Sequence, residues 1–142
     1  ADYSPWQLPL PVTNNNTSPL TLHGVQVSFS QVTLDMSVET TKHMVVGAGS
    51  SILIVDRAPS GTAVIEEPAL ATLDLYTKAK DASLGGLALT HGTTVGNIVE
   101  FSGPKVGTGS PTEQDLNGVQ MLSVPLTINP DAGNDELVIT VK

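Results

Sequence analysis

Residues 25–38, VQVSFSQVTLDMSV, contain the pattern on which the fold class depends. Apolar and polar residues alternate from Val25 to Phe29, and a period of two is typical of a β-strand with one buried face. The alternation resumes at Val32 with the opposite parity. The change of parity at Ser30–Gln31 predicts a β-bulge or bend, which would curve the sheet or redirect the strand.

Six more segments have the composition or alternation expected of strands: residues 51–57, 62–67, 86–92, 97–103, 118–128 and 136–141. Pro59-Ser60-Gly61 separates the first two segments, so we expect these two to pair as a hairpin. The stretch GAGSS at residues 47–51 begins like a phosphate-binding loop. It lacks the Gly-Lys-Ser/Thr ending and a following helix, and is therefore interpreted as a turn between strands.

One segment, ALATLDLYTKAK at residues 69–80, has the composition of a helix. Alanine and leucine favour helices, Lys78 and Lys80 complement the dipole of the last turn, and Gly85–Gly86 would stop the helix. Three residues fall near one helical face: Leu70, Leu73 and Tyr76. The strands do not alternate with helices, which argues against a parallel α/β sheet. The sequence predicts a mainly β protein, an antiparallel β-sandwich or partly closed β-barrel with one flanking α-helix.

The chain divides into an arm and a domain. Residues 1–19 hold four of the ten prolines, and proline lacks the N–H that a helix or sheet ladder needs. We therefore expect an extended, Pro-rich arm. Trp6, Leu8 and Leu10 within it are apolar, which predicts that the arm docks on its own domain or on a neighbour. Residues 20–142 are expected to form a single β-sandwich or barrel domain.

The composition argues against several functional classes. Six Lys and Arg against fourteen Asp and Glu give a net charge of −8, whereas gripping a nucleic-acid backbone needs a positive footprint. The chain has no cysteine, so disulfides and thiolate chemistry are excluded. Apolar runs fall short of the roughly 18 residues of a membrane span, and we expect no membrane partner. Because the chain begins with Ala1, we expect either a processed protein or a segment of a larger one.

Residues with catalytic potential lack the required spacing. His23, His43 and His91 are far apart and do not follow the His-Glu-x-x-His pattern of zinc proteases. Glu66 and Glu67 are neighbours on a predicted strand, so their side chains point to opposite faces, unlike the carboxylate pair of a glycosidase. A Gly-x-Ser-x-Gly nucleophile elbow is also missing. We therefore predict no enzymatic activity, no cofactor and no metal.

The segment NPDAGNDE at residues 129–136 contains three acidic side chains, Asp131, Asp135 and Glu136. They could belong to a calcium site, to an interaction surface or only to a turn. A calcium loop needs regularly alternating oxygen ligands and a glycine at a fixed position, and both are misplaced here. Gly133–Asn134 tolerates positive φ, so we predict a turn joining the last two strands, with its acids as surface or lumen charge.

Two long segments resemble the C-terminal part of tail tube proteins from long-tailed bacteriophages. They are LALTHGTTVGNIVEFSGPKV, residues 87–106, and GVQMLSVPLTINPDAGNDELVITV, residues 118–141. In both this chain and that family, a Gly-Asn precedes a strand that leads into a Pro-Lys-Val segment, and a later strand ends in a Pro-x-x-Gly-Asn-Asp-Glu loop. The stretch VGAGSSILIVDRAPSGT, residues 46–62, is similar to an earlier part of these proteins. The order of several motifs carries the resemblance, which covers more than half of the chain.

The resemblance implies a virion structural protein with a β-barrel or sandwich and a flanking helix. Tail tube proteins form rings, usually hexameric, that stack into a hollow tube through which DNA passes during ejection. The implied partners are further copies of the chain, other tail proteins, and phage DNA that is not specifically bound. Residues 1–19 or 103–115 would join successive rings, and an acidic lumen would let DNA slide. The implied location is the phage tail, assembled in the cytoplasm of the bacterial host.

Two other classes stay open. One is a different head or tail component, such as a decoration or tail-terminator protein. The other is a secreted β-sandwich adhesin or binding module. Carbohydrate binding wants a platform of exposed aromatic rings, and the chain has five aromatic residues in total.

Overall fold

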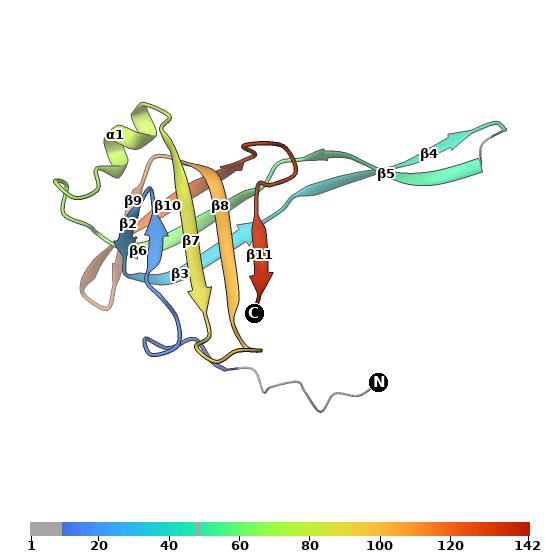
Figure 1. Ribbon diagram of the computed structural model, residues 1–142. Helices are drawn as coiled ribbons and strands as arrows, with labels where there is room; N and C mark the ends of the chain where they lie inside the picture. The colour runs from blue at the N-terminus through green and yellow to red at the C-terminus, as the bar shows by residue number, and fades with distance from the viewer. Residues whose placement is uncertain (1–9, 48) are drawn as a thin grey trace.

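The computed structural model describes residues 10–47 and 49–142, and these residues form a mainly β protein (Figure 1). Its strands are β1 (Leu20–Leu22), β2 (Val25–Val27), β3 (Phe29–Asp35), β4 (Val38–Val45), β5 (Gly49–Arg57), β6 (Ser60–Glu66), β7 (Leu84–His91), β8 (Val99–Thr108), β9 (Thr112–Leu116), β10 (Val119–Asn129) and β11 (Val138–Val141). A short helix, α1 (Leu75–Lys80), lies between β6 and β7. The mainly β architecture with one helix confirms the predicted fold class.

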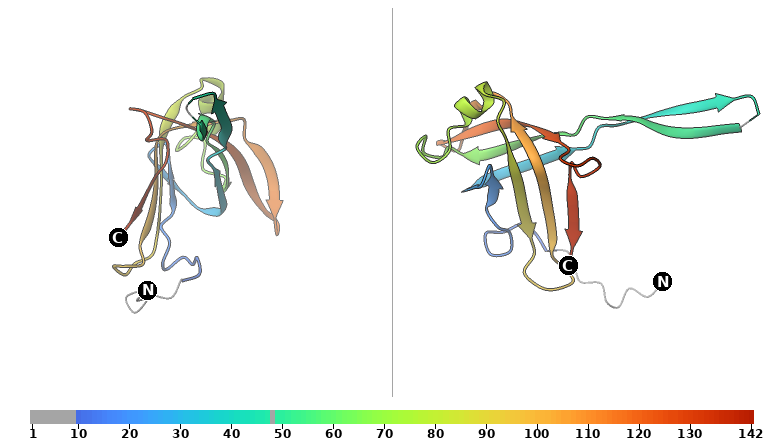
Figure 2. Two further views of the ribbon diagram at one scale, coloured as in Figure 1. Left: turned by 90° about the vertical axis from the view of Figure 1, so that its right-hand side faces the viewer. Right: turned by 45° about the horizontal axis from the view of Figure 1, so that its top comes forward.

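Nine strands form one antiparallel sheet in the order β2-β1-β7-β8-β10-β6-β3, with β9 also paired to β10 and β11 to β8. The strands β7, β8 and β11 run across the direction of β3, β6 and β10, so the sheet folds over on itself (Figures 1 and 2). The two ends of the order, β2 and β3, do not pair with each other. The sheet therefore stays open and does not close into a barrel.

The core lies between the two halves of the folded sheet. Along β10, alternate residues from Leu122 to Ile128 are buried, which is the period-two pattern of a strand with one face inward. The buried apolar cluster comprises Leu20, Leu22, Val27, Ala63, Ile65, Leu73, Leu75, Leu87, Val106, Leu122, Val124, Leu126 and Ile128. Burial of each large side chain stabilises the fold by about 1.5–3 kcal/mol before entropy is counted.

The structure confirms the bulge predicted from the parity change, because the register between β3 and β6 shifts between Phe29 and Gln31. The predicted hairpin of residues 51–57 with 62–67 is wrong. The strand β5 pairs with β4, and β6 pairs with β3 and β10. Gly61 is needed for a different reason than a turn: a Cβ there would clash with the Thr33 carbonyl oxygen of β3.

The helix is shorter than the predicted 69–80. It begins at Leu75 because Asp74 is its N-cap, with a carboxylate oxygen accepting from the Thr77 backbone N–H at 3.0 Å. The residues before it form a turn, in which Leu73 N–H donates to the Ala69 carbonyl. Leu73 and Leu75 are buried, whereas Leu70 and Tyr76, expected near the same helical face as Leu73, are exposed.

The end of the helix also differs in part from the prediction. Lys78 and Lys80 lie in the last turn as expected. The C-cap is Asp81, and Gly85–Gly86 lies inside β7 instead of stopping the helix. A Cβ at Gly85 would meet the ring of His23 at 2.5 Å, so the close approach of that ring requires glycine.

The last two strands lie end to end along β8. Asn129 of β10 is the partner of Lys105, and Val138 of β11 is the partner of Ser102. The loop of residues 130–137 therefore leaves the sheet after β10 and returns to it as β11, which pairs with the next part of β8. It joins the last two strands as predicted, but those strands pair with β8 and not with each other.

His23 makes the fold sensitive to pH. It occupies the two-residue turn between β1 and β2 with φ +51, and its Nε2 is buried without a hydrogen-bond partner. Burial lowers the pKa of His23, and the positive charge of Lys78 lowers it further. The unfolded chain then binds this proton more readily than the folded chain, so stability is complete above the ordinary pKa of 6.5 and falls as the pH drops below it.

We predict that His23→Asn removes most of the loss of stability between pH 7.5 and 5. Asparagine tolerates positive φ and, followed by Gly24, makes the favoured hairpin turn. The measurement is urea unfolding across this pH range. His43→Asn, a change on the exposed strand β4, is the control and should keep the wild-type pH dependence. An equal effect of both substitutions would contradict the assignment to His23.

Candidate functional site: a projecting hairpin and its anchor

The strands β4 and β5 form a long hairpin, residues 38–57. From here on the name arm refers to this hairpin and not to the Pro-rich residues 1–19. The arm projects from the body of the molecule, as Figure 1 and the right view of Figure 2 show. Every described residue of the arm is exposed except Arg57 at its root. At the tip, Gly47 and Gly49 have positive φ, which confirms the predicted turn between strands in this stretch.

The arm continues two strands of the body. The strand β4 follows β3 after Met36–Ser37, and β5 runs into β6 after Ala58–Pro59. The pairs β3–β6 and β4–β5 therefore form one long antiparallel hairpin. Only the part made by β3 and β6 lies on the core, so the arm has no packed layer behind it.

Cross-strand partners assign the side chains of the arm to two faces, because residues directly opposite each other point to the same side. The first face carries three pairs: Thr40 with Ile54, Lys42 with Ile52, and Met44 with Ser50. The second face carries Thr41 with Leu53, His43 with Ser51, and Val45 with Gly49. Apolar side chains are thus distributed over both faces.

The apolar side chains of the first face are more exposed than Val45 and Leu53 of the second face. Met44, Ile52 and Ile54 are 72%, 76% and 66% exposed, against 42% and 45% for Val45 and Leu53 on the second face. A two-stranded hairpin alone in water is marginally stable, and contiguous exposed apolar side chains mark an interaction surface. The geometry thus suits binding of another protein surface through side chains and free strand edges.

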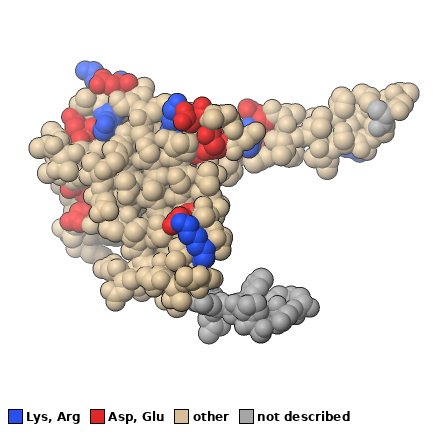
Figure 3. Space-filling model, in the orientation of Figure 1, with Lys and Arg blue, Asp and Glu red and all other residues tan. Residues whose placement is uncertain are grey.

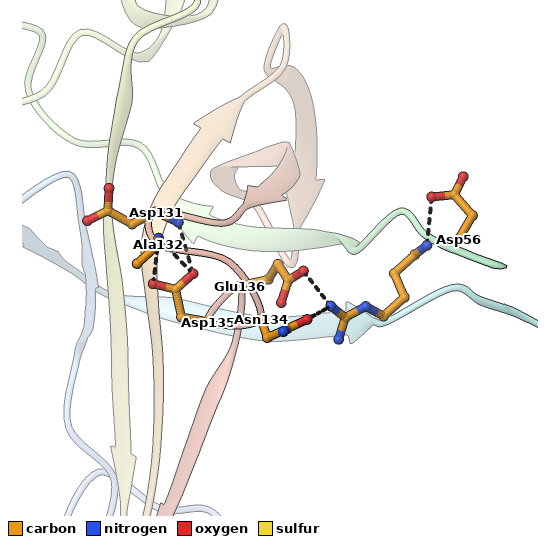
Figure 4. Close-up of polar contacts among 7 residues, drawn as sticks. Asp56, Asp131, Ala132, Asn134, Asp135 and Glu136 are labelled. Carbon is orange, nitrogen blue, oxygen red and sulfur yellow. Dashed lines mark hydrogen bonds and ion pairs between the residues drawn. The ribbon is translucent and has the colours of Figure 1, made fainter. Parts of the chain in front are cut away.

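An ion pair and a hydrogen bond anchor the root of the arm to the loop of residues 130–137 (Figure 4). Arg57 Nη2 lies 3.1 Å from Glu136 Oε1 and also donates to Asn134 Oδ1. Glu136 is only 8% exposed, so its charge depends on this partner. A hollow of about 500 Å³ lies beside this anchor, lined by arm residues 54–57 together with Asn134 and Glu136.

The loop that carries the anchor is braced by its own side chains. The Asp135 carboxylate accepts hydrogen bonds from the backbone N–H groups of Asp131 and Ala132 (Figure 4). These bonds lower the pKa of Asp135, with the Ala132 N–H contributing most. Asp131 pairs with Lys105 on β8, and this contact raises the pKa of that lysine. Gly133 and Asn134 adopt positive φ, as predicted.

The three acidic residues singled out in the sequence have separate roles and do not converge. Asp131 faces Lys105, Asp135 braces the loop, and Glu136 is buried against Arg57. Within residues 10–47 and 49–142, no group of three or more His, Asp or Glu side chains is placed to hold a metal ion. The loop thus directs its acids inward or to neighbouring cations.

The other predicted interaction residues lie at the start of the chain. Trp6 and Leu8 fall outside the described residues. Leu10 is 43% exposed, and its carbonyl oxygen accepts a hydrogen bond from His91 Nε2 at 3.2 Å. Residues 103–115, expected to join rings, are mostly the strands β8 and β9 of the sheet. Strand β9 is fully exposed and pairs with β10.

The arm was missed as an element because its first strand, VETTKHMV, has no apolar alternation. Its β-branched residues Thr40 and Thr41 were the available signal.

Figure 3 shows that most Asp, Glu, Lys and Arg side chains on this face lie over the body and the arm root, whereas the outer arm is largely uncharged. Residues 10–47 and 49–142 contain no helix that is long and apolar enough to cross a membrane.

We predict that Arg57→Gln lowers the free energy of unfolding by about 2 kcal/mol, because it leaves the Glu136 carboxylate buried without its cation. The measurement is urea denaturation at neutral pH. Arg57→Gln/Glu136→Gln should recover part of the loss, because the buried charge is then removed.

Lys105→Gln is the matched control, since it breaks the exposed pair with Asp131. We expect it to cost less than about 1 kcal/mol. Equal losses for Arg57→Gln and Lys105→Gln, or no recovery in the double variant, would show that the buried pair does not hold the root of the arm.

Comparison with known proteins gives matches of structure. No protein-family model and no curated protein sequence matches the chain. A chain in the structure of the anti-feeding prophage cap, the AFP tube-terminating cap, matches with a TM-score of 0.66 and 15% identity, covering 96% of this chain and 95% of that chain.

Two further matches come from PVC, an extracellular contractile injection system in its extended state. A chain from the structure of its sheath/tube terminator has a TM-score of 0.67 and 10% identity. The match covers 95% of this chain and 100% of that chain. A chain of its sheath–tube complex has a TM-score of 0.66 and 9% identity, covering 93% of both chains. The protein therefore shares its fold, over nearly its whole length, with chains of contractile injection systems and their tube-terminating structures.

Proposed function

We propose that this protein is a structural subunit of a phage-tail-like particle and acts at the end where the tube is terminated. The observation that carries the proposal is the arm, a projecting hairpin with exposed apolar side chains on both faces. A two-stranded ribbon is only marginally stable in water, and exposed apolar side chains of this kind mark a surface that a partner covers. The fold that the protein shares with chains in structures of a tube-terminating cap and a sheath/tube terminator supports the same role.

The terminating position is favoured over the tube itself by the matched assemblies. Two of the three matches described above come from structures of a tube-terminating cap or terminator. A tube subunit that stacks in rings, hexameric as in the tail tube proteins that the sequence resembles, is the second candidate. The match to a chain of a sheath–tube complex favours it.

In this proposal, copies of the chain associate into a ring and the arm of each copy covers apolar surface on a neighbour. The free edges of β4 and β5 offer unpaired N–H and C=O groups for strand addition. Further partners are other tail proteins. The subunit is a non-enzymatic component of a tail-like particle, assembled in the cytoplasm of a bacterial host.

The acidic composition fits a role beside a channel. With a net charge of −8 the protein repels a nucleic-acid backbone. DNA that passes through such a ring would slide without specific binding.

Electron microscopy of the purified protein tests the proposal and separates the two candidates. A terminator forms rings that do not elongate, alone or at raised concentration. A tube subunit forms hollow tubes of open-ended length. A protein that remains monomeric at high concentration, and when mixed with tube and sheath proteins of its own particle, would refute both roles.

We predict that Met44→Ser/Ile52→Ser/Ile54→Ser reduces the assembled fraction at least tenfold, because it removes the most exposed apolar side chains of the arm. The free energy of unfolding should change by less than about 0.5 kcal/mol per substitution, since these side chains touch no core. Assembly is measured by sedimentation velocity and by counting rings in micrographs.

A control with the same chemistry uses three residues outside the arm that are also more than half exposed: Leu70, Leu84 and Ile139. Their simultaneous replacement by serine should leave most of the assembled fraction. If the control abolishes assembly and the arm variant does not, the interface lies on the body and the arm is not the contact.

A further inference from the structure

The turn between β9 and β10 consists of two residues, Asn117 and Gly118. Both have positive φ, +55 and +83, and the residues that flank them, Leu116 and Val119, are cross-strand partners. This is the type I′ turn that Asn-Gly favours in a two-residue hairpin. All residues from 112 to 120 are exposed, so the turn is open to solvent.

An Asn-Gly pair has a chemical reactivity that other asparagine pairs show much more weakly. Asparagine is a thermolabile residue, because the backbone nitrogen of the next residue can attack the carbon of its side-chain amide. Glycine in the next position speeds this attack, since it has no Cβ to obstruct the approach. Asn117 is the only asparagine of the chain that is followed by glycine.

The reaction at this pair is a deamidation. The Gly118 N–H loses its proton to hydroxide, and the nitrogen forms a bond to Asn117 Cγ. The bond from Cγ to Nδ2 breaks, and Nδ2 takes up a proton from water and leaves as ammonia. Water then opens the succinimide ring at one of its two carbonyl carbons. One opening leaves aspartate at this position, and the other leaves isoaspartate, in which the backbone runs through Cγ and is one methylene longer.

A single hydrogen bond holds the nitrogen that would attack. The Gly118 N–H donates to Asp115 Oδ1 at 3.1 Å. Gly118 lies outside both strands, so the ladder of β9 and β10 does not use this N–H, and the side chain satisfies it instead. A bond to a carboxylate is stronger than one between neutral groups. It makes the proton less available to hydroxide, and the bond must break before the nitrogen can attack.

We propose that Asn117 is a site of spontaneous deamidation and that the Asp115 carboxylate slows the reaction in the folded protein. The site matters because the turn sets the register of β9. Among residues 10–47 and 49–142, β9 pairs with β10 alone, and all of its side chains are exposed.

The isoaspartate product would not fit this turn, because its additional backbone methylene breaks the two-residue geometry. We expect its formation to loosen β9 and to free the edge of β10 from Val119 to Ser123. The modification would therefore mark older molecules by a change at one strand edge. This inference does not depend on the proposed role in a tail.

The test follows deamidation of the full chain at pH 8, folded and unfolded in guanidinium chloride. Trypsin releases residues 106–142 as one peptide that contains Asn117 and Asn134, and mass spectrometry assigns the conversion to each. In the folded protein we expect Asn117 to react severalfold faster than Asn134 and severalfold more slowly than in the unfolded chain. Asn134 is the internal control because it is also exposed with positive φ, but Asp135 follows it.

Asp115→Ala removes the hydrogen bond and should speed the conversion of Asn117 severalfold in the folded protein. Glu113→Ala is the matched control: it removes an exposed acid from the same strand and leaves the bond from Gly118 to Asp115 in place. It should keep the wild-type rate. Hydrogen exchange of residues 112–116 checks that β9 stays paired. If Asp115→Ala releases β9, Asp115→Glu replaces it with the same expected increase, because it keeps the charge and displaces the acceptor by one methylene.

Four results overturn the proposal. If Asn117 reacts no faster than Asn134, the turn is not a deamidation site. Equal rates for Asn117 in the folded and unfolded chain show that the fold gives no protection. An unchanged rate in the Asp115 variant, or an equal increase in Glu113→Ala, shows that the hydrogen bond to Gly118 is not what slows the reaction.

Discussion

A single hairpin extends beyond the core that supports it, so one continuous ribbon has a packed half and an uncovered half. Where β3 pairs with β6, side chains on one face join the core. Where the same two chain segments continue as β4 and β5, both faces meet water. Backbone hydrogen bonds alone do not fix the direction of such a ribbon. The contact of Arg57 with Asn134 and Glu136 supplies a side-chain restraint at the root.

Sequence patterns predicted most of the elements that lie on the core, but not the short strand β1, whose Leu20 and Leu22 are fully buried. Parity from Val25 to Val38 located the bulge, and alternation along residues 118–128 located a strand that is buried on one face. The patterns failed where burial is absent or where a single local contact decides. The strand β4 has no buried face and therefore no alternation. The helix begins at Leu75 because of the Asp74 cap, although the alanines and leucines before it favour helix.

The candidate site was less accessible to prediction because its parts meet only in three dimensions. Arg57 and Glu136 are far apart in the chain, and the register of β10 and β11 on β8 brings the loop to the arm root. The sequence presented Glu136 as a surface or lumen charge, whereas it is buried. The turn chemistry of Gly133–Asn134 was local and could be predicted.

The exposed ribbon also makes the free protein prone to aggregation through its strand edges. Residues 50–55, SSILIV, combine high β-propensity with no charge and no proline, the composition that favours cross-β stacking. The segment lies at an unprotected strand edge. The charged residue directly across from it is Lys42 of β4, the partner of Ile52. Newly made copies of the chain whose ribbon is uncovered are therefore exposed to fibre formation. Synthesis in step with the supply of partners, or a holding chaperone, would keep the concentration of uncovered ribbons low.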